Sequence, residues 1–527
     1  MAATRLWLVR QNRFKEKVEN LMTDTSIIVN AQRIIGQVNR RLFGSFVEHL
    51  GRSVYDGIYE PMHPTADEDG FRTDVIELVR ELGVSAIRYP GGNFVSGFKW
   101  EDSVGPREQR PARLNLAWHS TESNEVGLHE FSRWLEKIDS ELMLAINLGT
   151  RGVAEALELL EYTNIDSGTH LADQRAVNGR PQSFNVRMWC LGNEMDGPWQ
   201  LGHRSADDYG KLASQTAKAL RQLDPDLELV ICGSSSAQMP TFGEWERVVL
   251  THAFEDVDFI SCHAYYEEKN NDLKSFLASA VNMDHFIDSV ISTIDNVRAT
   301  LGGTKTINIS FDEWNVWYLQ RFNAVDKITG AQNWPHAPRI LEDVYTVADA
   351  VVVGSLLISL LKHADRVTSA SLAQLVNVIA PIMTEPGGAA WRQTIYFPFA
   401  LTSRLAIGTA LDVDVRSPTY ETMDYGSVPQ VDAVATHDTA SGKVSIFLVN
   451  RSSTESRDVA IDVSTFGAVS ILETHTLNAD DPYLANTLAQ PEKVKPQRNN
   501  SVSIGVGIVT VTLPPISWTA ISLGTTA

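Results

Sequence analysis

The sequence predicts a (β/α)8 barrel followed by a C-terminal antiparallel β-sandwich. Between about residues 40 and 385, eight short runs rich in β-branched residues alternate with longer amphipathic runs. This alternation is typical of parallel strands joined by helices, and eight such units close a barrel. From about residue 395 the chain changes to short alternating runs separated by turn residues, which favours an antiparallel sandwich.

The eight barrel strands are predicted from runs of the length found in buried sheets. They are residues 44–49, 83–90, 141–149, 186–194, 227–234, 257–266, 306–314 and 367–378. Helical patterns separate them, among them residues 72–83, 205–225 and 341–365. Ser205 is a suitable N-cap for the second of these, and Asp224-Pro225 ends it.

Turn residues divide the chain. Pro386, Gly387 and Gly388 cluster where the pattern changes, so we place the catalytic barrel at residues 40–390 and the sandwich at residues 391–527. Residues 26–39 alternate loosely and indicate β-structure before the barrel.

Composition excludes several classes of protein. Apolar residues make up 43% and charged residues 21%, which is typical of a compact globular protein. The net charge of −20 argues against a nucleic-acid partner, because such proteins gather Lys and Arg on one face. The ligand is therefore expected to be neutral or small.

Cysteines and apolar segments indicate the state of the thiols and the cellular location of the protein. Cys190, Cys232 and Cys262 lie in separate apolar runs, so buried thiols are expected rather than disulfides or a zinc site. The N-terminus has no apolar segment followed by a cleavage site, which predicts a cytoplasmic protein. Residues 347–361 are apolar but too short to span a bilayer, and we expect a buried helix there.

Polar residues gather where the predicted strands end. In a barrel these ends form the catalytic face, because the loops that follow the strands meet there. The residues are Glu48, Arg88, Asn93, Asn193, Glu194, His263, Tyr265, Glu313 and Gln374. Any one of them could be a solvated strand end, and His263 could be a structural histidine. Burying so many polar groups together is costly unless they are paired or functional.

Two of these residues point to a reaction. Glu194 and Glu313 follow strands four and seven, and a pair of carboxylates is what glycoside hydrolysis requires. Aromatic residues suited to sugar rings lie near them in the sequence: Trp100, Trp118, Tyr265, Trp314 and Trp317. Aromatic residues are more often part of a core, and Trp314 fits a core position as well as a site position, whereas Trp317 lies beyond the strand end and favours ligand contact. No GxSxG, HExxH or nucleotide-binding glycine motif is present, so His263 is not expected to bind a metal.

Six segments together resemble the α-L-arabinofuranosidases of glycoside hydrolase family 51. In chain order they are FGSFVEHLGRSVYDGIYEP, RYPGGNFVSGFKWEDSVGP, LAWHS, WCLGNEMDGPWQ, SCHAYY and FDEWNVWY. The resemblance extends from about residue 26 to the C-terminus and leaves residues 1–25 as an extension. It implies a barrel whose catalytic carboxylates lie on strands four and seven, and a sandwich that includes the strand segment 26–39.

The resemblance also implies roles for the strand-end residues. Glu194 would be the general acid/base and Glu313 the nucleophile of a retaining enzyme. The residues expected to hold the sugar or the two carboxylates are Glu48, Arg88, Asn93, Asn193, His263, Tyr265 and Gln374, with Trp118 and Trp317 lining the site. Family members act without a metal or cofactor, and many form hexamers.

We therefore expect an exo-acting α-L-arabinofuranosidase that removes terminal arabinofuranosyl residues from arabinan, arabinoxylan and arabino-oligosaccharides by double displacement. Nucleic acid and membranes are not expected partners. The alternatives are a glycosidase or endoglucanase of the same clan with another sugar preference, and a carbohydrate-binding protein without activity. Residues 321–343 are expected to shape the leaving-group side, but the linkage is not predicted.

Overall fold

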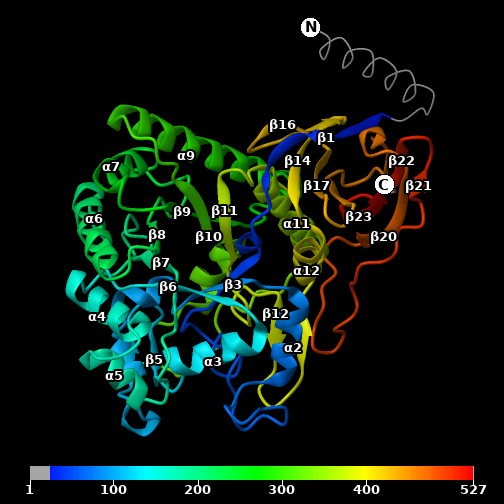
Figure 1. Cartoon of the computed structure of the whole chain (residues 1–527). Coiled ribbons are helices and arrows are strands. Elements are labelled where there is room, and N and C mark those ends of the chain that lie inside the picture. Colours follow the sequence, from blue (N-terminus) through cyan, green and yellow to red (C-terminus); the bar gives the residue numbers. More distant parts are fainter. Residues whose placement is uncertain (1–23, 526–527) are drawn as a thin grey trace.

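The computed structural model describes residues 24–525, and its larger part is a closed barrel of eight parallel strands (Figure 1). In chain order the strands are β2 (Gly44–Phe46), β3 (Ala86–Tyr89), β6 (Glu141–Ala145), β7 (Met188–Leu191), β8 (Glu228–Ile231), β9 (Phe259–Tyr266), β10 (Asn308–Val316) and β11 (Val367–Leu372). Each lies within or overlaps one of the eight predicted runs, so the predicted barrel is confirmed.

Helices surround the barrel strands. They are α2 (Thr73–Leu82), α3 (Leu128–Ile138), α4 (Val153–Asn164), α5 (His170–Val177), α6 (Ala206–Leu223), α7 (Glu244–Ala253), α8 (Leu273–Leu277), α9 (Ala280–Leu301), α11 (Val347–Lys362) and α12 (Tyr396–Leu405). Ser205 caps α6 by accepting a hydrogen bond from the Asp208 amide, and the helix ends at Asp224, as predicted. Helix α11 begins later than predicted, because Thr346 and Asp349 form a capping box that fixes its first turn.

Short elements connect these helices and strands. Single turns are η1 (Arg40–Phe43), η2 (Asn93–Gly97), η3 (Trp100–Ser103), η4 (Arg107–Gln109), α10 (Leu319–Arg321), η5 (Phe322–Asp326) and η6 (Ser464–Phe466). Two-stranded ladders join β4 (Arg113–Asn115) to β5 (Ser120–Glu122), β12 (Ile382–Thr384) to β13 (Ala390–Arg392), and β15 (Thr419–Thr422) to β16 (Gly426–Pro429).

The C-terminal part is a nine-stranded sheet in the order β20-β23-β18-β17-β14-β1-β19-β22-β21. Its strands are β1 (Thr25–Gln37), β14 (Thr409–Arg416), β17 (Val431–Asp438), β18 (Lys443–Asn450), β19 (Arg457–Asp462), β20 (Val469–Leu477), β21 (Ser503–Ile504), β22 (Ile508–Leu513) and β23 (Ser517–Thr525). All pairs are antiparallel except β1 with β19. One apolar cluster joins side chains of β17, β18 and β23 to those of β19 and β22, so the sheet curls over its own core. The predicted antiparallel β-domain is confirmed, as one continuous hydrogen-bonded sheet.

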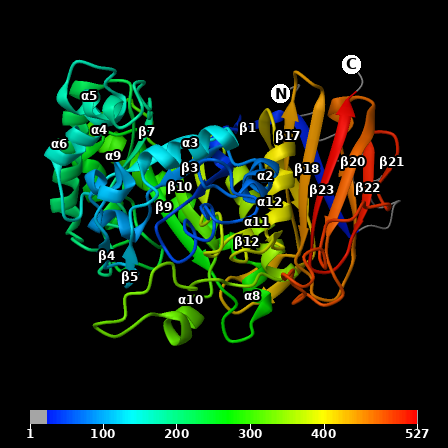
Figure 2. The same cartoon turned by 90° about the horizontal axis from the view of Figure 1, so that it is seen from below.

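Helix α11 lies between the barrel and this sheet (Figure 2). It is buried from Val347 to Leu361, because one side faces the barrel and the other faces the sheet. At Gly354 a Cβ atom would lie 2.2 Å from Trp518 Cδ1, so only glycine permits this contact. The predicted boundary at residue 390 falls at the first residue of β13, and α12 beyond it packs against α11 and α2. The domain limits therefore stay a prediction.

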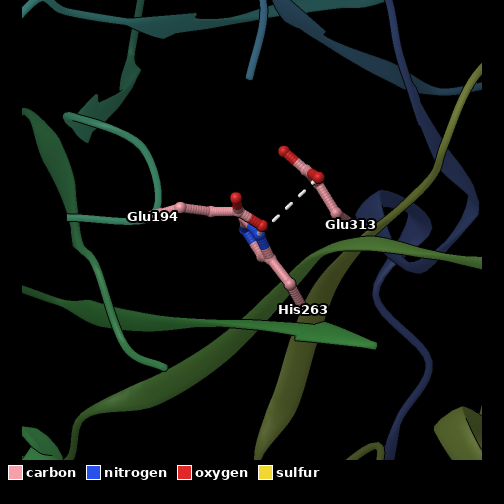
Figure 3. A group of neighbouring side chains, drawn as sticks. All are labelled: Glu194, His263 and Glu313. Atoms are coloured by element: carbon pink, nitrogen blue, oxygen red, sulfur yellow. Dashed lines mark hydrogen bonds and ion pairs between the residues drawn. The ribbon is translucent and has the colours of Figure 1, made fainter. Parts of the chain in front are cut away.

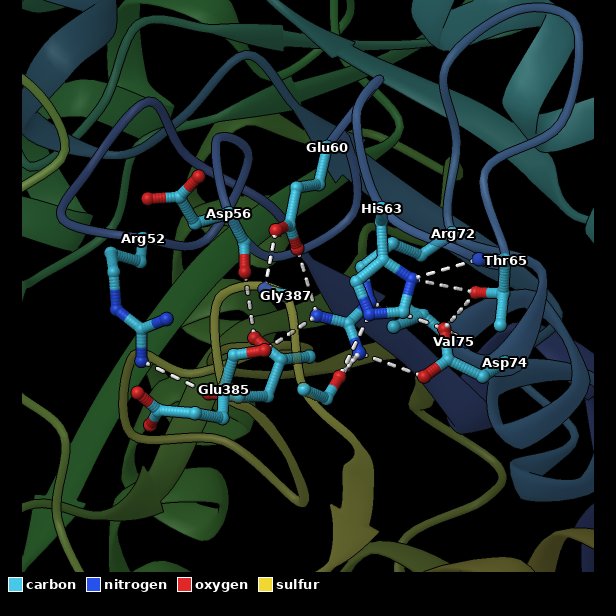
Figure 4. Close-up of polar contacts among 12 residues, drawn as sticks. Arg52, Asp56, Glu60, His63, Thr65, Arg72, Asp74, Val75, Glu385 and Gly387 are labelled. Carbon is cyan, nitrogen blue, oxygen red and sulfur yellow. Dashed lines mark hydrogen bonds and ion pairs between the residues drawn. The ribbon is translucent and has the colours of Figure 1, made fainter.

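A buried polar network fixes the irregular segment between β2 and α2 (Figure 4). Arg72 donates to the carboxylates of Glu60 and Asp74 and to the carbonyl oxygen of Gly388. His63 also bonds to the Gly388 carbonyl oxygen, at 2.8 Å. The network joins this segment to the β12–β13 hairpin, which follows the last barrel strand. The loops after the first and last strands are thereby held side by side.

Other predictions can be compared with the described residues. The three cysteines are buried and unpaired, as expected. No helix within residues 24–525 is long and apolar enough to cross a bilayer. The predicted extension, residues 1–25, lies outside the described residues except for its last two.

Candidate active site

A cavity of about 530 Å³ opens at the carboxyl ends of the barrel strands. The predicted residues that line it are Glu48, Asn93, Trp118, Glu194, Tyr265, Glu313, Trp317 and Gln374. Arg88, Asn193 and His263 are buried, and each bonds directly to a residue of the cavity wall. These eleven predicted residues are thus brought together, as expected for strand ends of a barrel.

The backbone of β10 explains why Glu313 faces the cavity. Its register against both β9 and β11 shifts by one residue over positions 311–313, which is a β-bulge. Consecutive side chains of a regular strand point to opposite faces. Here Asp312 and Glu313 both approach Arg88, with Asp312 Oδ2 lying 3.5 Å from Nε and Glu313 Oε1 lying 2.7 Å from one terminal nitrogen.

Both oxygens of Glu313 accept hydrogen bonds. Arg88 donates to Oε1 at 2.7 Å, and the Tyr265 hydroxyl donates to Oε2 at 2.7 Å. Burial raises the pKa of Glu313 above its ordinary value, although His263 and Arg88 act in the opposite direction. The carboxylate is therefore held in one orientation, with its charge compensated by the guanidinium of Arg88.

Glu194 reaches the cavity from a sharp turn after β7. Gly192 has φ of 97° and Glu194 has φ of 43°, so two of three consecutive residues adopt left-handed backbone. Such strain at a non-glycine residue is found where function requires it. Glu194 Oε1 lies 2.9 Å from His263 Nδ1, and Trp199 Nε1 donates to Oε2 at 2.6 Å.

The two carboxylates point toward each other, with His263 beside them (Figure 3). One oxygen of Glu194, one oxygen of Glu313 and one ring nitrogen of His263 all lie within 4.8 Å of one another. His263 Nδ1 is 2.9 Å from Glu194 Oε1 and 3.6 Å from Glu313 Oε2. One ring nitrogen of the imidazole is therefore close to both acids.

These three residues are also the set that could hold a metal ion within the described part of the chain. His263 Nε2 is 3.0 Å from Asp312 Oδ1, so both ring nitrogens face carboxylates. Burial lowers the pKa of His263, but Glu313, Asp312 and Glu194 together raise it well above the ordinary value. A protonated ring that donates from both nitrogens has no lone pair for a metal.

Glu48 joins three walls of the cavity. Oε1 accepts from Trp118 Nε1 and from the Phe94 amide, both at 2.8 Å, and Oε2 accepts from Gln374 Nε2 at 3.2 Å. Burial raises the pKa of Glu48 to about 7, against these hydrogen bonds. Asn193 extends the polar wall, since it accepts from Arg88 at 2.7 Å and donates to Asn93 at 3.2 Å.

Loops form the rim of the cavity. Trp317 follows β10 and packs edge-on against Tyr265, with ring centroids 5.0 Å apart. Phe322 and Ile340, from the β10–α11 loop (residues 317–346), line the same wall. The loop is attached to the β4–β5 hairpin, because the Trp334 ring stacks on His119 at 3.8 Å.

Some site residues were missed from the sequence. Asp312 was overlooked because strict strand alternation directs it away from the site. Trp199 lies within the WCLGNEMDGPWQ motif, yet nothing in its spacing indicates a bond to Glu194. Two aromatic candidates were wrong: Trp100 and Trp314 are buried in the main apolar core and do not line this cavity, because tryptophan serves packing as readily as sugar binding.

Comparisons with known proteins identify the family of this chain. Residues 78–284 match the family described as "Alpha-L-arabinofuranosidase 1 domain", and residues 312–517 match "Alpha-L-arabinofuranosidase C-terminal domain". An exo-α-(1→6)-L-arabinofuranosidase from Bifidobacterium longum is 57% identical, over 95% of this chain and 97% of the relative. An intracellular exo-α-(1→5)-L-arabinofuranosidase from Streptomyces lividans is 58% identical, over 92% of this chain and 73% of the relative.

A solved structure extends the likeness to three dimensions. A family 51 α-L-arabinofuranosidase from Bifidobacterium longum matches with a TM-score of 0.92 and 50% identity, covering 95% of this chain and 99% of that one. The resemblance found in the sequence motifs is confirmed over nearly the whole chain. The chain belongs to the α-L-arabinofuranosidases of glycoside hydrolase family 51.

Proposed function

We propose that this protein removes terminal non-reducing α-L-arabinofuranosyl residues by a retaining double displacement, with Glu313 as nucleophile and Glu194 as general acid/base. The observation that carries the proposal is the facing pair of carboxylates, in which an oxygen of Glu194 lies within 4.8 Å of an oxygen of Glu313. Retaining glycosidases place their carboxyl groups about 5–5.5 Å apart, whereas inverting enzymes need roughly 6.5–9.5 Å to admit water.

In the first step Glu313 attacks the anomeric carbon while Glu194 protonates the departing oxygen. Arg88 and Tyr265 hold the attacking carboxylate by one bond to each oxygen, which lowers the entropic cost of reaching the reactive geometry. The product of this step is a glycosyl ester on Glu313 and a free leaving group.

In the second step Glu194, now ionised, takes a proton from water, and the resulting hydroxide displaces Glu313 from the anomeric carbon. Two inversions give net retention. Trp199 and His263 donate to the two oxygens of Glu194, and these donors stabilise the anion that this step requires.

The sugar is held by the remaining polar wall. Glu48, Asn93, Asn193 and Gln374 supply acceptors and donors for ring hydroxyls, and Trp118 and Trp317 supply apolar faces for the sugar's C–H surface. With arabinofuranose seated there, residues 321–343 border the space left for the leaving group.

The names of the relatives support the substrate and the setting. Their names give exo-α-(1→6) and intracellular exo-α-(1→5) arabinofuranosidase activities. We therefore assign short fragments of arabinan and arabinoxylan, taken up by the cell, as the substrates, within L-arabinose metabolism. The word intracellular in the name of one relative also supports a cytoplasmic enzyme. The family resemblance supports a hexamer, which light scattering coupled to size-exclusion chromatography tests.

A panel of nitrophenyl glycosides tests the activity. We expect release from the α-L-arabinofuranoside and not from β-glucoside or β-xyloside, and NMR of the first product should show retained configuration. Release from the β-glucoside or β-xyloside would support a different glycosidase of the clan. An inverted product would contradict the double displacement, and no release from any substrate would favour a binding protein.

No metal takes part in this mechanism, because both nitrogens of His263 are engaged by carboxylates. Dialysis against EDTA should leave the rate of arabinofuranoside hydrolysis unchanged. A loss of activity that a divalent cation restores would contradict this assignment.

A further inference from the structure

Asp312 is a buried acid that the mechanism above does not use. Only 1% of its surface is exposed, and its carboxylate contacts the His263 ring and the Arg88 guanidinium. Oδ1 is 3.0 Å from His263 Nε2, and Oδ2 is 3.5 Å from Arg88 Nε. Cys190 Sγ donates a weak bond to Oδ2 at 3.8 Å. The bulge in β10 is what turns this side chain inward beside Glu313.

We propose that Asp312 is a positioning residue that holds His263 as an imidazolium beside the two catalytic carboxylates. The inference rests on the proposed roles of Glu194 and Glu313. It adds a residue that contacts neither the sugar nor the reacting atoms, and that acts through the histidine.

The charges of the buried cluster support the proposal. In the free enzyme, the cations Arg88 and His263 face the anions Asp312 and Glu313, while Glu194 carries a proton. In the glycosyl-enzyme the charge of Glu313 is lost to the ester and Glu194 is ionised. Two cations therefore face two anions at each stage, and no charge has to enter or leave a buried site.

Position matters as much as charge. His263 Nδ1 lies within 3.6 Å of an oxygen of each catalytic acid, so one proton can support whichever acid is ionised. Both oxygens of Glu194 accept a hydrogen bond, Oε1 from His263 Nδ1 and Oε2 from Trp199 Nε1. The charged imidazolium is the stronger donor, so it disfavours a proton on Oε1, and the proton that Glu194 transfers lies on Oε2. Three other titratable groups lie near the two catalytic acids, namely Tyr265, Glu48 and Asp196. None of them forms a hydrogen bond to His263 among the described contacts.

The variant Asp312→Asn removes the negative charge of this side chain and keeps its shape. The amide oxygen can still accept from His263 Nε2–H, but the anion that favours the imidazolium is gone. A neutral ring in that tautomer leaves Nδ1 as an acceptor, which draws the Glu194 proton to Oε1 and away from the leaving group. We expect impaired acid catalysis with an intact fold.

The expected result is a loss that depends on the leaving group. kcat/KM for an arabino-oligosaccharide should fall by about 10²-fold, within the range that general acid catalysis contributes. For the nitrophenyl arabinofuranoside the fall should be much smaller, because that phenolate departs without protonation. Ser310→Ala is the matched control, since it removes a buried hydroxyl of the same strand that has no hydrogen-bond partner, and it should leave both substrates unaffected.

Several outcomes would overturn the proposal. Equal losses on both substrates for Asp312→Asn would indicate a purely structural role. If that variant does not fold, neutron diffraction from wild-type crystals at neutral pH decides the question, since a single proton on the His263 ring would exclude an imidazolium. Failure of the wild-type protein to hydrolyse any arabinofuranoside would instead refute the proposed function, and is distinguished by the wild-type assay alone.

Discussion

The floor and the rim of the cavity are built in different ways. The floor consists of side chains on or next to barrel strands. Hydrogen bonds of 2.7 and 3.0 Å join Glu313 to Arg88 and Asp312 to His263, and ion pairs of 3.5–3.6 Å connect the two pairs. The rim consists of loops, and the β10–α11 loop meets the β4–β5 hairpin through a ring stack and a few hydrogen bonds. A strand-borne network fixes reacting groups precisely enough for chemistry, whereas a loop-built rim can change the leaving group it accepts without disturbing them.

The sharpest test of the floor is Glu313→Ala. Removing the attacking group should lower kcat by on the order of 10⁴-fold or more, whatever the leaving group, as nucleophile removal does in other enzymes. Steady-state rates on nitrophenyl and oligosaccharide substrates measure this loss. Added azide should give a glycosyl azide of inverted configuration, and a product of retained configuration would contradict the assignment.

A second test uses Glu194→Ala, whose effect should depend on the substrate. Oligosaccharides should lose about 10²- to 10⁴-fold in kcat/KM, because their leaving oxygen needs a proton, and nitrophenyl substrates should lose much less. Azide needs no general base, so it should partly restore turnover and give an azide of retained configuration. Equal losses on both substrates without an azide effect would show that Glu194 is not the acid.

How much of the structure could be predicted from the sequence also follows the division between floor and rim. Alternating runs gave all eight barrel strands, because buried parallel strands have a composition that helices and loops lack. The motif residues were brought together because strand ends in a barrel share one face. The inward turn of Asp312 was not predicted, since a bulge depends on the register of β10 against two strands distant in sequence.

In the C-terminal sheet, too, the pairing of strands distant in sequence could not be predicted. Alternation predicted an antiparallel β-domain but not every strand of it, since β14 and β20 were not identified. The parallel pairing of β1 with β19 joins residues near 25 to residues near 459. Nothing local in either segment encodes that partner. Helix α11 was predicted because its apolar length is unusual, whereas its first residue depended on the capping box of Thr346 and Asp349.

Glu48 lies where floor and rim meet, and its titration tests how tightly they are joined. Its pKa of about 7 in the folded protein is above the ordinary value of 4.5, so the folded state retains a proton that the unfolded state has released. The stability from this proton is present below about pH 4.5 and is lost as pH rises toward 7, by up to about 3 kcal/mol.

Glu48→Gln is neutral at every pH, so its thermal unfolding midpoint should fall less than that of the wild type between about pH 5 and pH 8. Glu68→Gln, which changes an exposed carboxylate, is the control and should follow the wild type. Parallel curves for Glu48→Gln and the wild type would mean that Glu48 is ionised throughout this range.

The smallest effect is expected at the rim. Trp334 does not line the cavity, but it stacks on His119, and its carbonyl oxygen accepts from Thr121. An aromatic pair contributes about 0.5–1.5 kcal/mol. Trp334→Ala should therefore loosen the β10–α11 loop and raise KM for oligosaccharides by roughly threefold to tenfold.

The matched variant Trp334→Phe keeps a ring for the stack and should stay close to the wild type. With either substitution, kcat for oligosaccharides and the kinetic constants for the nitrophenyl substrate should change little. The reason is that Glu194 and Glu313 are held by bonds that do not involve this loop. A fall in kcat for Trp334→Ala on both substrates would show that the rim and the floor are coupled. An unchanged KM on oligosaccharides would show that the attachment of the loop to the hairpin has no part in choosing the leaving group.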